Sequence, residues 1–436
     1  MQVSVEITSS LERRMTITVP ATRVDSEVNE RITKTARTVR MDGFRPGKVP
    51  LAVVKKRFGA SIRQEAMGDL IRDCFYEAVT QEKLSPAGMP TIESIKDEGD
   101  DSVAFVASFE VYPEVKLGSL AGITVERPVA TVSDADVDKM VDTLRRQRAT
   151  WTDTAEAAKD ADRLDIDFDG SVDGEAFEGG AAKGFSLVLG SKRMIPGFED
   201  QLVGAKAGDE RSLNVTFPDD YQAEALKGKA AVFKVKVNTV QTPVLPEINE
   251  EFLKAFGITD GGVDKFRADV RKNMERELKQ AIKTNTKNQA LDGLVKAHSI
   301  DVPKAMISNE IQRLRENMFK QFGGNAKNIN PEMLPDELFA EQAKRSASLG
   351  LLVAEIIRSA DLKVDATRVK ALIDEIAESY ETPSEVVDWY YGNKEQLQQV
   401  EAVVLEDQVV DHILAAAQVS DKAVAYEEVL RPQQQG

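Results

Sequence analysis

Residues 190–199 read Gly-Ser-Lys-Arg-Met-Ile-Pro-Gly-Phe-Glu, and the residues around this stretch indicate the architecture of the middle of the chain. On either side, apolar side chains occupy every second position, which is typical of strands with one buried face. Glycines and Asp-rich turns separate these runs, and Pro196 opens a short helix that ends near Gly204. Residues 150–245 are therefore predicted to form a small antiparallel β domain with one short helix. The alternating runs are 164–168, 185–189, 213–217 and 233–237.

Residues 1–112 are predicted to form an α+β unit. A helical pattern covers residues 24–39, and Ser61 is expected to cap a second long helix that ends near Lys83. Alternating apolar residues indicate strands at 3–7, 15–19 and 103–109.

Residues 246–436 have helical periodicity throughout and are predicted to form an all-helical region. Residues 113–149 connect the parts, and Ser133 with Asp136 makes a start like a capping box for a helix that packs back onto the C-terminal region. The predicted fold class is therefore multidomain α+β.

The charge of the chain is unevenly distributed. The formal net charge is -16, which makes nucleic acid an unfavourable partner for the whole molecule. Residues 31–63, however, contain ten Lys and Arg side chains against one acid, Asp42, whereas residues 365–430 contain fifteen acids against four bases. Such asymmetry predicts different partners for the two ends.

Several classes of site are excluded by composition. The single cysteine, Cys74, permits no intrachain disulfide, and two distant histidines, His298 and His412, exclude a Cys/His metal site. The chain lacks a phosphate-binding loop and a dinucleotide fingerprint, so no cofactor and no metal are expected. The first residues do not resemble a secretory signal, and no apolar run reaches the roughly 18 residues of a membrane span. We therefore expect a cytoplasmic protein with no membrane partner.

Residues 43–50 interrupt the helical pattern of the N-terminal unit. Two glycines and two prolines in eight residues cannot continue a helix, so this is an exposed loop. Phe44 beside Arg45 and Lys48 has the character of an interface anchor. The alternative is a turn whose phenylalanine folds back onto its own domain.

The same stretch resembles the signature loop of the trigger factor family. The resemblance implies docking on the large ribosomal subunit at the exit tunnel, through both a ribosomal protein and rRNA, in a contact that weakens with salt. Many members of the family carry a basic residue where this chain has Pro46, so one cation of the contact is missing. The ribosome-binding residues implied are Gly43, Phe44, Arg45, Pro46, Gly47 and Lys48.

The middle domain resembles FKBP-type peptidyl-prolyl isomerases, on the basis of residues 190–199 together with Gly204, 208–210 and Tyr221. The resemblance makes Phe198 the floor under the substrate proline and lets Ile195 donate its N–H to the substrate carbonyl. For any single phenylalanine, the alternative is simply the core of a β domain. The residues that the resemblance assigns to the site are Phe168, Phe177, Glu178, Phe185, Met194, Ile195, Phe198, Tyr221 and Phe233.

Isomerisation of an X-Pro bond requires few functional groups from the protein. Rotation of a peptide bond crosses a barrier of about 18–20 kcal/mol, and the planar amide is more polar than the twisted transition state. An apolar surface therefore disfavours the planar form relative to the twisted one without an acid, a base or a metal.

The helical region carries an excess of methionine and phenylalanine, which can line surfaces that accept many partners. The alternative, favoured for most of these residues, is a helix–helix core. By resemblance, the region is a chaperone domain with arms that cradles nascent chains without ATP, and the free protein forms a homodimer. A dedicated isomerase and a holdase with a vestigial isomerase domain are the competing functions. The candidate substrate-binding residues are Met306, Met318, Phe319, Phe322, Met333 and Leu338.

Overall fold

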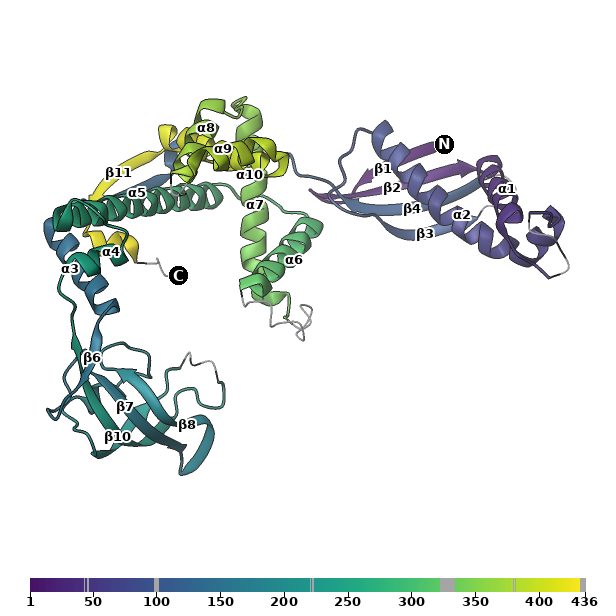
Figure 1. Cartoon of the computed structure of the whole chain (residues 1–436). Helices are drawn as coiled ribbons and strands as arrows, with labels where there is room; N and C mark the ends of the chain where they lie inside the picture. Colours follow the sequence, from purple (N-terminus) through teal and green to yellow (C-terminus); the bar gives the residue numbers. More distant parts are fainter. Residues whose placement is uncertain are drawn as a thin grey trace. The chain divides into compact units, whose positions relative to one another are not determined.

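The computed structural model describes residues 1–42, 44, 47–97, 102–219, 221, 223–321, 334–378, 380 and 382–431 (Figure 1). The chain divides into two compact units, Met1–Pro128 with Lys283–Lys422, and Val129–Ile282 with Ala423–Gly436. None of the described helices is apolar enough over a sufficient length to cross a membrane. The four domains predicted from the sequence, 1–112, 113–149, 150–245 and 246–436, follow different boundaries and stay predictions.

The N-terminal part of the first unit is a four-stranded antiparallel sheet in the order β1-β2-β4-β3, with two helices on one face (Figure 1). Its core contains alternate residues of β2 and β4, such as Met15, Ile17 and Phe105, packed against both helices. The elements are β1 (Gln2–Ile7), β2 (Glu12–Pro20), α1 (Ala21–Thr38), α2 (Leu51–Gln81), β3 (Thr91–Asp97) and β4 (Ser102–Glu110).

Two features of this part differ from the prediction. Helix α2 begins directly after Pro50, not at Ser61, because Val54 and Ile62 bury the same helical face and keep the helix continuous. Strand β3 was not predicted. Its ladder with β4 contains an irregularity between Ile92 and Ser94, which interrupts the alternation that would reveal a strand.

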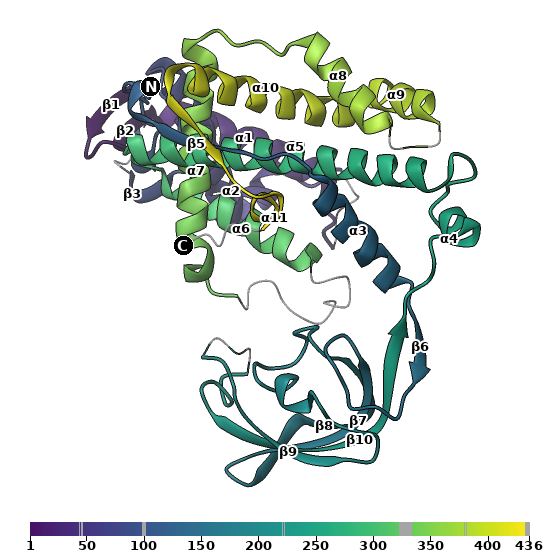
Figure 2. The same ribbon diagram turned by 90° about the vertical axis from the view of Figure 1, so that its left-hand side faces the viewer.

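The β domain of the second unit confirms the four predicted strands. The sheet order is β6-β10-β7-β8, with β9 paired to β10 (Figure 2). The predicted helix between Pro196 and Gly204 is reduced to the 3₁₀ turn η2, because Gly197 and Gly204 adopt φ values of 81° and 80°, which end a right-handed helix. The elements are β6 (Thr150–Asp153), β7 (Arg163–Val172), β8 (Glu175–Val188), η2 (Asp200–Leu202), β9 (Glu210–Thr216) and β10 (Ala230–Val244).

The second unit also contains helices that pack on the first part of a long helix, α5. Helix α3 begins with a capping box, in which the Ser133 N–H donates to Asp136 Oδ2 over 3.0 Å and the Asp136 N–H donates to Ser133 Oγ over 3.3 Å. Val137 of α3 shares a core with Phe266 and Val270 of α5. The helices are α3 (Asp134–Gln147), α4 (Glu250–Ala255), α5 (Gly262–Ala297) and α11 (Tyr426–Leu430).

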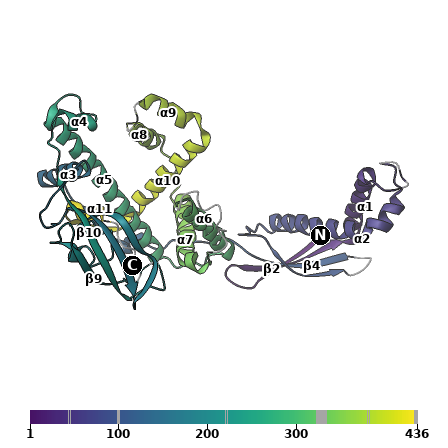
Figure 3. The same ribbon diagram turned by 60° about the horizontal axis from the view of Figure 1, so that its bottom comes forward.

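The first unit contains the remaining helices. Helices α6 and α7 lie side by side (Figure 3) around Ile311, Phe339 and Ala343. Helices α8, α9 and α10 share a separate core that includes Val369 and Val404. The helices are α6 (Lys304–Gln321), α7 (Glu337–Ser359), α8 (Ala366–Ala377), α9 (Pro383–Gly392) and α10 (Lys394–Ala416).

The sequence predicts an entirely helical C-terminal region, but the structure contains one strand there. Strand β11 (Gln418–Ala423) pairs with β5 (Thr124–Val129), and Figure 2 shows the two running together. All six residues of β11 are exposed. It therefore has no alternating apolar face, and its sequence pattern does not reveal it.

Candidate functional site

The aromatic residues predicted for the isomerase site converge in the β domain. Phe168 of β7 lies at the centre, with its ring centroid 5.7 Å from that of Phe185 and 6.0 Å from those of Phe198 and Phe233. Phe233 of β10 lies 5.3 Å from Phe198 and 6.0 Å from Phe177 of β8. These are edge-to-face contacts, the favoured geometry for aromatic pairs.

The cluster has a buried floor and a half-buried rim. Phe198 is fully buried, and Phe168 and Phe233 are nearly so. The remaining predicted apolar residues are partly exposed and pack against this floor, so they offer apolar surface to a ligand. Glu178 lies beside the cluster on β8 and is exposed. The rim residues are Phe177, Phe185, Met194, Ile195 and Tyr221.

Phe217 joins the same cluster although the prediction did not include it. Its ring centroid lies 4.7 Å from that of Tyr221 and 5.7 Å from that of Phe177, and its side chain is buried. The signal was present, because Phe217 is the last apolar position of the alternating run 213–217. Phe217 directly follows β9 and supports the rim residue Tyr221 through this ring contact.

Two glycines allow the rings to approach the backbone. A Cβ at Gly170 would lie 2.5 Å from the nearest ring carbon of Phe233, and a Cβ at Gly180 would lie 2.9 Å from the ring of Phe177. Real side chains do not tolerate such distances without displacement of a neighbour. The two glycines therefore permit the observed positions of these rings.

The turn that follows β8 carries Met194 and Ile195 to the rim. Glu199, which follows the floor residue Phe198, is 7% exposed. Its carboxylate accepts hydrogen bonds from the backbone N–H groups of three successive residues of the turn, Lys192, Arg193 and Met194. No pattern in the sequence assigns a role to Glu199, because only the folded turn brings its hydrogen-bond partners together.

The site as a whole is apolar and contains no cluster suited to a metal. Among the described residues, no group of three or more His, Cys, Asp or Glu side chains is arranged to hold an ion. The arrangement can bind an apolar ring against Phe198 and present backbone N–H groups at one edge. It can therefore favour rotation about an amide bond but supplies no acid, base or nucleophile in its floor.

The basic loop is described only in part. Phe44 is 38% exposed, so its ring does not fold fully into its own domain. Gly47 has a φ of 79°, and Lys48 is exposed next to the buried Val49. The predicted residues Gly43, Arg45 and Pro46 lie outside the described residues.

The candidate residues in the helical region differ in exposure. Met318 is 38% exposed and Leu338 is 66% exposed, whereas Met306 and Phe319 are half-buried. Phe322 and Met333 lie outside the described residues. The exposed pair flanks the core between α6 and α7, so part of the apolar excess is core and part is available to a partner.

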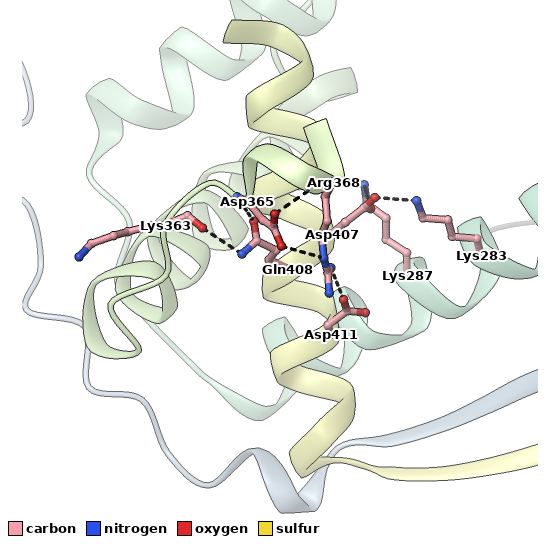
Figure 4. Close-up of polar contacts among 8 residues, drawn as sticks. All are labelled: Lys283, Lys287, Lys363, Asp365, Arg368, Asp407, Gln408 and Asp411. Carbon is pink, nitrogen blue, oxygen red and sulfur yellow. Dashed lines mark hydrogen bonds and ion pairs between the residues drawn. The ribbon is translucent and has the colours of Figure 1, made fainter. Parts of the chain in front are cut away.

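A polar network joins α8 and α10 to α5 (Figure 4). Asp407 of α10 faces two lysines of α5, with Lys283 Nζ at 2.6 Å and Lys287 Nζ at 4.0 Å. Arg368 of α8 donates to Asp411 Oδ2 over 2.5 Å. These contacts lie between the α8–α10 core and the core that contains Val409, so they help to set the direction of α10.

Comparisons with known proteins match these regions in order. Residues 1–144 match the family model of the bacterial trigger factor protein, residues 154–238 that of FKBP-type peptidyl-prolyl cis-trans isomerase, and residues 262–415 that of the bacterial trigger factor C-terminus. A solved structure from a study of promiscuous substrate recognition by the trigger factor chaperone also matches, over 95% of this chain and 99% of the chain in that structure. Its identity is 17% and its TM-score is 0.49, which is too low to add to the assignment.

Full-length relatives are similar along the whole chain. The trigger factor of Pseudomonas fluorescens (strain Pf0-1) is 57% identical over 99% of this chain and 98% of its own length. The trigger factor of Pseudomonas aeruginosa (strain LESB58) is 56% identical over the same shares, and that of Alcanivorax borkumensis is 53% identical over 100% and 99%. The chain belongs to the trigger factor family, with an FKBP-type peptidyl-prolyl isomerase domain inserted between its N-terminal and C-terminal regions.

Proposed function

We propose that this chaperone docks through its basic loop on the large ribosomal subunit at the exit tunnel and isomerises X-Pro bonds of nascent chains in the cytoplasm. The observation that carries the isomerase activity is the ring cluster, with its buried floor of Phe168, Phe198 and Phe233 under a half-buried rim. A prolyl ring bound on Phe198 would place its amide in an apolar environment, which favours the less polar twisted state. No cofactor takes part.

The docking proposal is supported by the exposed ring of Phe44 and by the ten cations of residues 31–63. An aromatic anchor surrounded by cations suits a surface made of protein and phosphate-rich rRNA. Gly43, Arg45, Pro46, Gly47 and Lys48 would complete the contact.

Co-sedimentation with bacterial ribosomes tests the docking. The wild type should pellet with ribosomes at low salt and less at moderate salt, whereas the variant Phe44→Ala/Arg45→Ala/Lys48→Ala should remain in the supernatant. A matched control is Lys206→Ala/Lys227→Ala, which removes two exposed cations from the β domain. Equal pelleting of wild type and the loop variant would place the dock elsewhere.

The isomerase activity is tested at the rim, where a ring can be removed at small cost in stability. Phe185→Leu should lower kcat/KM for a proline-containing peptide about ten-fold while the melting temperature changes little, because Phe185 is half-buried. Phe58→Leu is the control, since it truncates a half-buried ring in the N-terminal domain. An unchanged kcat/KM for Phe185→Leu would exclude this ring from the site.

We also propose that the exposed residues of α6 and α7 hold unfolded clients. Met318→Ser/Leu338→Ser should weaken the suppression of aggregation of a proline-free unfolded protein. Met306, Phe319, Phe322 and Met333 would extend this surface. Full suppression by the variant would place client binding on another surface, and no suppression by the wild type would support a dedicated isomerase instead. Loss of the suppression on deletion of residues 150–243 would argue against a vestigial isomerase domain.

The opposite charges of residues 31–63 and 365–430 support a homodimer off the ribosome. Sedimentation velocity at increasing salt tests this, since an electrostatic dimer dissociates as salt rises. A dimer fraction that is independent of salt would contradict the charge argument.

A further inference from the structure

The carboxylate of Glu199 lies inside the turn that carries Met194 and Ile195. Oε1 accepts from Arg193 N over 2.9 Å, from Met194 N over 3.2 Å and from Ser191 Oγ over 3.3 Å, and Oε2 accepts from Lys192 N over 3.1 Å. A buried carboxylate requires such donors, because an ionised group without partners is costly to bury. Charge-assisted bonds of this kind are stronger than neutral ones.

The next N–H along the chain, that of Ile195, is available to donate a hydrogen bond to a substrate. Within the part of the chain that the structure describes, the Ile195 N–H has no hydrogen-bond acceptor, while the Ile195 carbonyl accepts from Phe198 N over 3.1 Å. Glu199 thus takes the three preceding amides and leaves Ile195 as the free donor at the rim. A free N–H beside an apolar floor is suited to bind the carbonyl of a peptide.

The turn would not hold this conformation through its own backbone. Gly190 has a φ of 81° and Lys192 a φ of 55°, a conformation that is unfavourable for a residue with a side chain. One backbone hydrogen bond, from Ser191 N to Val188 O over 3.2 Å, joins the turn to β8. The contacts to Glu199 are therefore the principal anchor of this conformation.

We propose that Glu199 is a positioning residue of the isomerase reaction, which orients the Ile195 N–H and the Met194 side chain toward a peptide bound on Phe198. The inference rests on the isomerase activity proposed above. Glu199 does not touch the substrate and exchanges no proton with it. Glu199 acts only by fixing the backbone of residues 192–195, so it affects the reaction through the position of the groups that contact the peptide.

Glu199→Gln tests the role with minimal change in volume. An amide presents one oxygen and one NH₂ group. The oxygen of the variant can keep the bonds to Arg193 and Met194, but the NH₂ group then faces the Lys192 N–H, and two donors cannot form a hydrogen bond. We expect kcat/KM for a proline-containing peptide to fall on the order of ten- to a hundred-fold, because small displacements of binding groups have effects of this size. The amide proton resonance of Lys192, which loses its acceptor, should move upfield, and those of Arg193 and Met194 should follow because their acceptor is no longer charged.

Asp200→Asn is the matched control. Asp200 adjoins Glu199, is exposed, and has no side-chain hydrogen bond or ion pair among the described residues. It should change neither kcat/KM nor these amide resonances.

Lys192→Gly in the Glu199→Gln background separates positioning from a loss of folding. Glycine adopts the φ of 55° without strain, so part of the lost kcat/KM, about five-fold, should return. Because this glycine also removes strain from the folded state, the melting temperature is measured with each kcat/KM, and a loss of kcat/KM in a fully folded variant is one of geometry.

The outcomes separate the two proposals. A wild type that does not accelerate X-Pro isomerisation overturns the isomerase function itself. An active wild type with an equally active Glu199→Gln overturns only the positioning role, as does a loss of kcat/KM that Lys192→Gly does not reduce.

Discussion

The ring of Phe233 on β10 lies against the backbone of Gly170, its register partner on β7, at a distance that would leave an added Cβ 2.5 Å from Cε1. Gly170→Ala must therefore displace this ring from the floor of the site. We expect a loss of about 1–3 kcal/mol in the free energy of unfolding of the β domain, typical of an overpacked core, and a lower kcat/KM.

The control for this change is Gly68→Ala in α2. No atom lies within 4 Å of a Cβ built there, and alanine favours a helix interior, so the N-terminal domain should keep or gain stability. Urea unfolding followed by Trp151 fluorescence in a Trp389→Phe background reports on the β domain. An unaltered midpoint for Gly170→Ala would show that the ring relaxes without cost.

Acid should destabilise the β domain through Asp167. The Gly184 N–H, and then the Asn238 side chain, hold the pKa of the Asp167 carboxyl below its usual range. Because the pKa in the folded state lies below that of the unfolded state, near 3.9, the stabilisation is present above that pH and is lost as the pH falls through the folded pKa.

Asp167→Asn should therefore flatten the dependence of the Trp151 urea midpoint on pH in the acid range. Glu175→Gln, which alters an exposed acid of β8, should leave the slope unchanged. A wild-type midpoint that stays constant from pH 5 to the acid limit of folding would contradict the assignment.

The network of Figure 4 predicts a local effect in α10. The Asp407 side chain is 19% exposed between two lysines of α5. Asp407→Ala removes the carboxylate that pairs with Lys283, whereas Lys287 keeps Glu406 at 2.9 Å. We expect a loss on the order of 1 kcal/mol, measured by Trp389 fluorescence during urea unfolding in a Trp151→Phe background. Glu401→Ala removes the same charge from the same helix. Glu401 makes no ion pair with a described residue, so this variant should lose less stability.

Cys74 supplies a probe of the N-terminal domain. The side chain is fully buried in α2, and burial raises the pKa of its thiol, so little reactive thiolate is present. Alkylation of the native chain at pH 8 should be on the order of a hundred-fold slower than that of an exposed cysteine, made by Ser61→Cys with Cys74→Ala. Equal rates would show that α2 opens readily.

The sequence was most informative where one physical pattern was strong. Alternation revealed β7, β8, β9 and β10, since each has one face in the core. The aromatic residues of the site could be located on these strands, but their roles came from family resemblance, because apolar periodicity does not separate a ligand surface from a core.

Other features depend on contacts between distant residues. The start of α2 after Pro50 follows from burial of Val54, and β11 has no buried residue to mark it. Glu199 reads in the sequence as an ordinary acid after Phe198. Its role emerges only when the turn directs three amides toward it.

The pairing of β5 with β11 has a consequence for the timing of synthesis. Arg127 and Asp421, which join the two strands at 2.8 Å, are 294 residues apart. Translation at about 5–20 residues per second delivers β11 roughly 15–60 s after β5. Until then β5 presents an open edge of the kind that recruits other chains. During its synthesis this chain thus carries β5 without its partner strand until β11 has been translated.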